Sequence, residues 1–359
     1  MKKKLFALAM AAALTVAVLG CLKRTNQLAN DRKKLEQFEK HGPMELYGAK
    51  CDYEELDLPY APGEPDDDYL TLDVYWSEHA GRAPIIVNIH GGGWIIGDKR
   101  DINSVYRSRF LAGRGYVVVN ANYRLLPKYP IPVQVNDVMG AVVWAKKNAE
   151  KYGGDPDRVG VMGGSAGGHL AAMAAWAGGS PHFSPTGHAG SEFDATVMAA
   201  VPFYGVFDLE PVITLNRNWT GAVSIPFFTG VSDREEQKKI LKMVSPKNYL
   251  TPDLPPTLFV CGDQDDFKLY PQSVQYSREL AELGVPSGLV TVPGALHGFD
   301  ADYGEPSTRE ALEQVAAWFD DHLKGAGPPP PEPPEWSPVS WEPLNDDHAP
   351  EADFEFGED

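Results

Sequence analysis

Ser165 lies at the centre of a glycine-rich pentapeptide, GGSAG (163–167), that fits the pattern G-x-S-x-G. A hydrophobic, strand-like segment precedes the pentapeptide, and an alanine-rich, helix-like segment follows it. A serine on such a turn projects its hydroxyl above the end of the sheet, where the helix N-terminus favours a developing anion. Gly163 and Gly167 are needed because side chains would clash where strand, turn and helix crowd together. The pattern therefore predicts that Ser165 is a nucleophile.

A second glycine-rich stretch, HGGGW (90–94), directly follows the strand-like segment PIIVNI. Three consecutive glycines let the backbone approach a substrate oxygen closely. We expect the N–H groups of Gly92, Gly93 and Ala166 to bind the negative charge that develops on that oxygen. A glycine-rich loop can also bind phosphate, but no Lys-Ser or Lys-Thr pair follows this one.

An acid and a histidine follow two later strand-like segments, in VCGDQDDF (260–267) and PGALHGF (293–299). His297 is positioned to exchange a proton with the nucleophile, and a carboxylate would hold its tautomer and stabilise the imidazolium. Asp263, Asp265 and Asp266 are the candidates for that carboxylate; only one can serve, and the other two are expected to be surface charges.

Alternating strand-like and helix-like segments must position these side chains. Short β-branched runs of near-continuous apolar character suit strands buried on both faces of a parallel sheet. These runs are PIIVNIH, YVVVNANY, RVGVMG, MAAVPFYG, PTLFVCG and GLVTVPG. Helix-like segments separate them, and YLTLDVYW alternates as in an antiparallel edge region. The pattern predicts one α/β domain, a mostly parallel sheet with helices on both faces. Cys261, within PTLFVCG, is expected to be a core residue.

Residues 205–250 interrupt this alternation. The segment is long for a plain crossover and carries its own aromatic residues, which is typical of a functional lid or binding loop. A crossover helix with a surface loop is the competing interpretation.

From Asp73 to Leu323 the chain resembles the α/β-hydrolase esterases of the hormone-sensitive-lipase-like and acetyl-xylan or feruloyl-esterase-like branch. The resemblance rests on HGGGWIIGDKR, on the region from NYRLLPKYP to GGSAGGHLAA, on SPKNYLTPDLPPTLFVCGDQD and on VPGALHGF. It implies the α/β-hydrolase fold with a small cap or lid insertion, and it selects Asp265 as the acid. The following DDFKLYP departs from the family pattern, so Asp266 remains a rival.

The combined motifs predict a serine hydrolase of carboxylic esters that needs no metal or cofactor. His90, Trp94, Tyr123 and Tyr204 are expected to line the substrate pocket and to suit a short or aromatic acyl group. By analogy with the family, acetyl or feruloyl esters on polysaccharide are candidate substrates. The alternatives are a small-amide hydrolase, such as a formamidase-like enzyme, and a non-catalytic surface lipoprotein on a hydrolase fold.

The first 20 residues read as a signal peptide, with a basic MKKK followed by an apolar run of 15 residues. VLGC resembles a lipobox, which implies lipidation of Cys21 and an envelope protein held at the membrane by its lipid alone. Ordinary secretion and an uncleaved anchor are the alternatives. Residues 21–50 would then be a lipidated N-terminus and linker, and residues 51–324 the hydrolase domain.

The charge and the last residues complete the domain plan. A formal net charge of −18 argues against nucleic-acid binding. Residues 325–359 form a segment rich in proline and acids, expected to be disordered because it cannot bury enough apolar surface. Trp336 and Trp341 could instead dock on the body. The oligomeric state is not predicted by the sequence.

Overall fold

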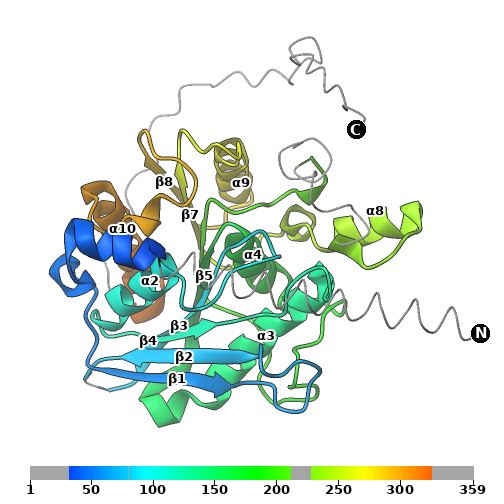
Figure 1. Cartoon of the computed structure of the whole chain (residues 1–359). Helices are drawn as coiled ribbons and strands as arrows, with labels where there is room; N and C mark the ends of the chain where they lie inside the picture. Colours follow the sequence, from blue (N-terminus) through cyan, green and yellow to red (C-terminus); the bar gives the residue numbers. More distant parts are fainter. Residues whose placement is uncertain (1–31, 80, 212–227, 326–359) are drawn as a thin grey trace, which may run out of the picture.

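An eight-stranded sheet forms the centre of the protein (Figure 1), as seen in a computed structural model that describes residues 32–79, 81–211 and 228–325. The strand order is β1-β2-β4-β3-β5-β6-β7-β8. Only β2 runs opposite to the other strands, because it pairs antiparallel with both β1 and β4. The strands are β1 (Tyr53–Pro59), β2 (Thr71–Trp76), β3 (Ala83–Ile89), β4 (Val117–Ala121), β5 (Gly154–Gly164), β6 (Ala199–Phe203), β7 (Thr257–Gly262) and β8 (Ser287–Val292).

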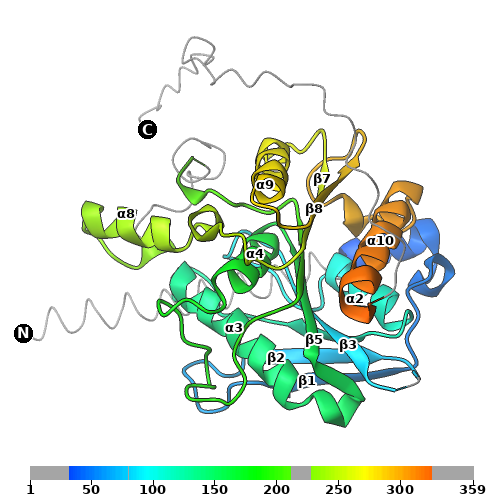
Figure 2. The ribbon, with the colours of Figure 1, turned by 180° about the vertical axis from the view of Figure 1, so that it is seen from behind.

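Helices cover both faces of the sheet (Figures 1 and 2), which confirms the predicted architecture. Side chains of α2 (Ile102–Ala112) and α10 (Pro306–Phe319) share one core cluster with one face of the sheet. Those of α3 (Ile131–Lys147), α4 (Ala166–Ala177) and α9 (Tyr270–Glu282) share the other cluster with the opposite face. Short helical turns are η1 (Met44–Tyr47), η2 (Ala149–Tyr152), η3 (Pro246–Tyr249), η4 (Phe299–Ala301) and η5 (Asp320–Lys324).

The central strands are apolar because both of their faces are covered. Every residue of β3, APIIVNI, is buried, and so is every residue of β7, TLFVCG. Within β7, burial raises the pKa of the Cys261 thiol, as fits the predicted core residue. All residues of α4 are buried as well, which explains why this helix is hydrophobic on every side.

Strand β1 was not expected from the sequence. Its residues, YEELDLP, are largely exposed, and its pairing with β2 shifts register between Glu55 and Leu58. β1 therefore forms the edge of the sheet, and β2, predicted to be the edge region, is paired on both sides. The acidic sequence YEELDLP lacks the apolar alternation by which strands are recognised in a sequence, so β1 was missed.

The long segment between β6 and β7 contains α8 (Arg234–Met243), which stands away from the sheet beyond α4 (Figure 1). Residues 212–227 lie outside the described residues, so a lid there remains a prediction. The predicted signal peptide, Cys21, and the tail with Trp336 and Trp341 also lie outside them. Among the residues described, no helix has both the length and the apolar character that crossing a membrane requires.

Candidate active site

Ser165 occupies a sharp turn between β5 and α4. Its backbone has φ 58° and ψ −118°, a conformation that residues other than glycine seldom adopt. The turn is held because the Ser165 N–H donates a 2.9 Å hydrogen bond to the Phe203 carbonyl of the neighbouring strand. Strain of this kind persists only where the surrounding fold imposes it, and it is typical of functional sites.

The two glycines of the G-x-S-x-G pattern allow the turn to pack against the chain around it. A Cβ on Gly163 would lie 2.5 Å from the Gly167 carbonyl oxygen. A Cβ on Gly167 would lie 2.3 Å from the Ile89 carbonyl oxygen. No side chain fits at either position, as the crowding argument predicted.

The structure brings the predicted serine, histidine and acid together at the carboxyl ends of β5, β7 and β8. His297 Nε2 is 2.8 Å from Ser165 Oγ, and His297 Nδ1 is 2.8 Å from Asp265 Oδ2. The Asp265 side chain is fully buried. When Nδ1 donates its proton to Asp265, Nε2 is left as the acceptor for the serine hydroxyl. This arrangement can generate a serine alkoxide and store its proton on the imidazole.

All three acids of the loop after β7 bind the segment around His297. Asp265 Oδ1 also accepts hydrogen bonds from the N–H groups of Phe267 and Leu269, at 3.0 and 3.3 Å. The carboxylates of the other two acids accept from the backbone of the segment that carries the histidine, Asp266 from His297 N–H (3.1 Å) and Asp263 from Gly294 N–H (2.7 Å). Asp263 and Asp266 are exposed, as expected of surface charges, and their carboxylates also hold the segment that carries His297.

These contacts predict unequal effects of three matched substitutions. We expect Asp265→Asn to lower ester turnover by ~10³–10⁴-fold, because the amide no longer fixes the required tautomer of His297. Asp263→Asn and Asp266→Asn should each lower it less than ~10-fold, since the amide oxygen still accepts a backbone hydrogen bond. Steady-state kinetics on the three purified variants measure this. A crippled Asp266→Asn beside an active Asp265→Asn would transfer the role to Asp266.

The HGGGW loop lies directly against the Ser165 turn. A Cβ on Gly91 would lie 2.9 Å from the Gly164 carbonyl oxygen and 3.4 Å from Ser165 Cβ. Gly92 and Gly93 have φ of 112° and 60°. Among the loop and turn hydrogen bonds of the described residues, neither of their N–H groups donates one. Free backbone donors beside the serine, together with Ala166 at the start of α4, can stabilise an oxyanion.

The four aromatic side chains predicted to line the substrate pocket are buried beneath the site instead. His90, Trp94, Tyr123 and Tyr204 are at most 2% exposed. The His90 ring stacks on Tyr123 with centroids 4.3 Å apart, and the Tyr204 ring packs against His297 at 4.6 Å. The sequence identified the aromatic character of this region but not the side of the loops that the rings occupy. In this structure the four side chains present almost no surface to solvent.

A buried ion pair lies under the site and was not recognised from the sequence. Arg107 of α2 and Asp300 of η4 are both fully buried, with Nη1 and Oδ2 2.6 Å apart. The Tyr204 hydroxyl donates to Asp300 Oδ1 at 2.5 Å, and burial raises the pKa of this phenol well above its usual value. A Cβ on Gly164 would lie 3.1 Å from Arg107 Nη1. The cluster thus joins the serine turn to the loop that follows His297.

His169, one helical turn after Ser165, is a further buried polar residue that the sequence reasoning left without a role. Its Nδ1 is 3.1 Å from Trp94 Nε1 and its Nε2 is 2.7 Å from the Val244 carbonyl oxygen. The burial of the ring lowers its pKa to about 4. His169 is therefore a neutral imidazole at neutral pH. Its place after GGSAGG, on the helix that carries the serine, was the one signal in the sequence.

The lowered pKa of His169 predicts a loss of stability in acid. The unfolded chain takes up a proton on this residue near pH 6.5, whereas the folded protein does so only near pH 4. The stabilisation is therefore complete above pH 6.5 and falls as the pH decreases toward 4, by about 3 kcal/mol in total. Urea unfolding at pH 7 and pH 4.5 should show a smaller pH effect in His169→Gln than in the wild type. Equal pH effects would contradict the prediction, and the exposed His182→Gln serves as control.

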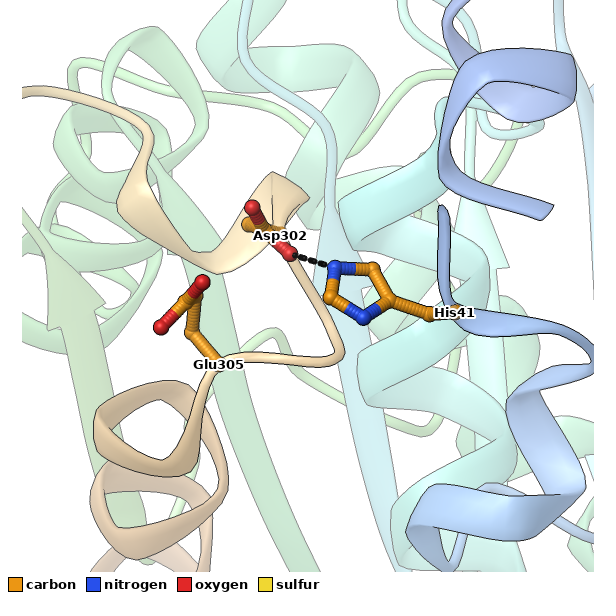
Figure 3. A group of neighbouring side chains, drawn as sticks. All are labelled: His41, Asp302 and Glu305. Atoms are coloured by element: carbon orange, nitrogen blue, oxygen red, sulfur yellow. Dashed lines mark ion pairs between the residues drawn. The ribbon is translucent and has the colours of Figure 1, made fainter. Parts of the chain in front are cut away.

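A second group of titratable side chains fastens the N-terminal part of the described chain to the loop after His297. His41, Asp302 and Glu305 come within reach of one another from the two segments (Figure 3). His41 Nε2 is 2.6 Å from Asp302 Oδ1, and Lys40 Nζ is 2.7 Å from Asp302 Oδ2 and 3.4 Å from Glu305. Burial alone would raise the pKa of Asp302, but Lys40 and His41 lower it. Because Lys40 already supplies a cation to both carboxylates, we interpret this group as an ion-pair cluster.

The sheet order, the serine on its strained turn and the acid and histidine at the ends of later strands define an α/β-hydrolase. Residues 72–280 match the family model BD-FAE. The chain therefore belongs to the BD-FAE family of α/β-hydrolase esterases, in agreement with the resemblance seen in the sequence.

Two curated relatives illustrate this membership, and one solved structure shares the fold. Esterase LipQ of Mycobacterium tuberculosis is 32% identical over 266 residues, 72% of this chain; the chain spans only 59% of LipQ. Versiconal hemiacetal acetate esterase of Dothistroma septosporum is 30% identical over 279 residues, 73% of this chain and 82% of that protein. Esterase B from Lactobacillus rhamnosis has a TM-score of 0.68 at 23% identity, covers 86% of this chain and 97% of its own, and shows the fold.

Proposed function

We propose that the protein is a carboxylesterase whose nucleophile is Ser165. The observation that carries the proposal is the pair of 2.8 Å contacts that link Ser165, His297 and Asp265 beside a loop with unused backbone donors. The names of the two relatives, an esterase and an acetate esterase, support the hydrolysis of carboxylic esters.

In the proposed reaction, Ser165 Oγ attacks the ester carbonyl carbon while His297 Nε2 takes its proton. The N–H groups of Gly92, Gly93 and Ala166 hold the oxyanion of the tetrahedral intermediate. The intermediate collapses when the imidazolium donates its proton to the leaving alkoxide, which departs as the alcohol. Water, deprotonated by His297, then attacks the acyl-enzyme and releases the acid and the free serine.

We propose short acyl esters, with acetyl esters as the first class to examine. The name of the acetate esterase supports this class. Feruloyl and acetyl groups on polysaccharide remain candidates through the family resemblance. The aromatic residues expected in the pocket no longer argue for an aromatic acyl group, because they are buried.

Two measurements test the proposal. A fluorophosphonate probe should label the protein at Ser165, and mass spectrometry of the labelled peptide identifies the residue. Turnover of p-nitrophenyl acetate should greatly exceed that of p-nitroacetanilide, since the anilide shares the acyl group but tests amide cleavage. Preferred cleavage of the anilide would favour the small-amide hydrolase. A protein that neither reacts with the probe nor turns over either compound would be a non-catalytic member of the family.

We further propose that Cys21, which lies outside the described residues, is lipidated and holds the protein at the bacterial cell envelope. The support is the VLGC sequence after a basic and then apolar segment. Cys21→Ser should move the protein from the membrane fraction to the soluble fraction with unchanged esterase activity, as followed by immunoblot and p-nitrophenyl acetate assay. A wild-type protein already in the soluble fraction would contradict lipidation.

A further inference from the structure

We propose that His169 is a positioning residue for the HGGGW loop (residues 90–94, from here on the oxyanion-hole loop). It anchors the Trp94 indole and thereby fixes the direction of the Gly92 and Gly93 N–H groups. The inference deepens the proposed function and rests on it. The His169 imidazole is buried and takes no part in the proposed proton transfers.

The hydrogen bonds of His169 permit one protonation state and one tautomer. An indole N–H can only donate, so His169 Nδ1, 3.1 Å from Trp94 Nε1, must accept. The other nitrogen, Nε2, therefore carries the proton and donates it to the Val244 carbonyl oxygen at 2.7 Å. Donation runs in one direction, from the indole through the imidazole to the backbone. A protonated ring would face the indole N–H with a second donor and break the chain.

Trp94 needs such an anchor because its backbone is strained. It has φ 62°, unusual for a residue with a bulky side chain, and it directly follows Gly92 and Gly93. Its carbonyl accepts from Leu126 N–H at 2.9 Å and from Gln134 Nε2 at 3.1 Å, which fixes the backbone from one side. The hydrogen bond from the indole to His169 fixes the side chain from the other side. Together these contacts impose a strained backbone conformation that would not persist without them.

His169 connects three segments of the chain, two of which carry the nucleophile and the proposed oxyanion donors. It lies on α4, where its N–H donates to the Ser165 carbonyl at 2.9 Å. Trp94 belongs to the oxyanion-hole loop, and Val244 caps the C-terminal end of α8 in the long segment between β6 and β7. The rings of His169 and Phe228 both meet the Trp94 indole edge-on, at 5.2 and 5.8 Å between centroids. His169 therefore contributes to the distance between the nucleophile and the oxyanion donors, together with the backbone contacts of Trp94.

The consequence concerns the transition state more than substrate binding. Donors displaced by a fraction of an ångström weaken the bonds to the oxyanion, which forms only during the reaction. Removing the anchor should therefore lower kcat and leave KM nearly unchanged.

Three substitutions separate this role from a packing role. His169→Leu removes both hydrogen bonds, Trp94→Phe removes only the indole donor, and His169→Gln offers a carbonyl acceptor and an N–H donor in place of the ring nitrogens. We expect His169→Leu and Trp94→Phe each to lower kcat for p-nitrophenyl acetate by ~10–10²-fold, with KM within ~3-fold. His169→Gln should recover most of the loss. The double variant Trp94→Phe/His169→Leu should be no slower than His169→Leu, because both remove the same bond.

A tetrahedral-adduct inhibitor, a trifluoromethyl ketone, reports on the oxyanion hole directly. Its inhibition constant should rise across the variants in proportion to the loss of kcat/KM. Melting temperatures show whether each variant folds, and His182→Gln, on an exposed histidine, serves as the matched control.

Each outcome decides the proposal. A folded His169→Leu with wild-type kcat would overturn it, and so would a His169→Gln no more active than His169→Leu. Fully additive losses in the double variant would show two separate packing effects and also overturn it. A wild-type protein without turnover or inhibitor binding would reject the carboxylesterase assignment itself, and this role with it.

Discussion

Replacing Ser165 by alanine is expected to reduce turnover of p-nitrophenyl acetate by at least ~10³-fold. The variant loses the only nucleophile that lies within hydrogen-bonding distance of His297 Nε2 among the described residues. The loss should appear in kcat, since the loop donors and the surrounding contacts remain. A stopped-flow or steady-state assay at neutral pH measures it.

The fold of this variant should be unaffected, because Ser165 is held through its backbone N–H and alanine retains that bond. Ser184→Ala, at an exposed serine after α4, is the matched control and should retain wild-type turnover. Full activity in Ser165→Ala would reject the assignment of the nucleophile outright.

Breaking the buried ion pair under the site should have the largest effect on stability. Arg107→Met leaves Asp300 as a fully buried carboxylate without its ion-pair partner, although the Tyr204 hydroxyl still donates to it. Removing one partner of such a pair costs about 3–5 kcal/mol. Urea unfolding at neutral pH, followed by tryptophan fluorescence, measures this. Turnover should fall as well, because Asp300 follows His297 by three residues and holds its loop.

A surface arginine on the same helix provides the comparison. Arg109 lies two residues further along α2 and pairs with Glu54 at 2.7 Å, with both side chains partly exposed. Arg109→Met should cost less than about 1 kcal/mol because solvent screens the pair. The double variant Arg107→Met/Asp300→Leu should recover part of the stability, since it removes the buried charge altogether. Equal destabilisation by Arg107→Met and Arg109→Met would contradict this account.

The sequence was informative wherever chemistry is encoded in a local pattern at the end of a strand. Ser165 directly follows one apolar strand and His297 lies in the loop after another, and the carboxyl ends of parallel strands meet at one edge of the sheet. The meeting of these two residues with Asp265 could therefore be predicted without coordinates. The choice among the three acids came from the family resemblance, because spacing alone does not say which carboxylate turns inward.

What the sequence did not reveal depends on contacts between distant segments. Arg107 and Asp300 are 193 residues apart, and nothing in a helix such as SVYRSRF indicates that one of its arginines is wholly buried. The orientation of Trp94 and Tyr204 was misjudged for a related reason. Composition places an aromatic residue near the site, but only packing decides whether its ring faces substrate or core.

The exposed edge strand β1 bears on whether two copies of the protein can pair through their sheets. The open edge of β1 carries Glu54 and Glu55, and its register shift interrupts the row of backbone donors and acceptors that another strand would need. Glu54 and Glu55 form ion pairs with Arg109 and Lys151, so a second copy that approached this edge would have to desolvate charged side chains against an irregular ladder. Such edges resist intermolecular strand addition. We therefore expect the charged, irregular edge of β1 to disfavour sheet pairing between molecules when the protein is concentrated.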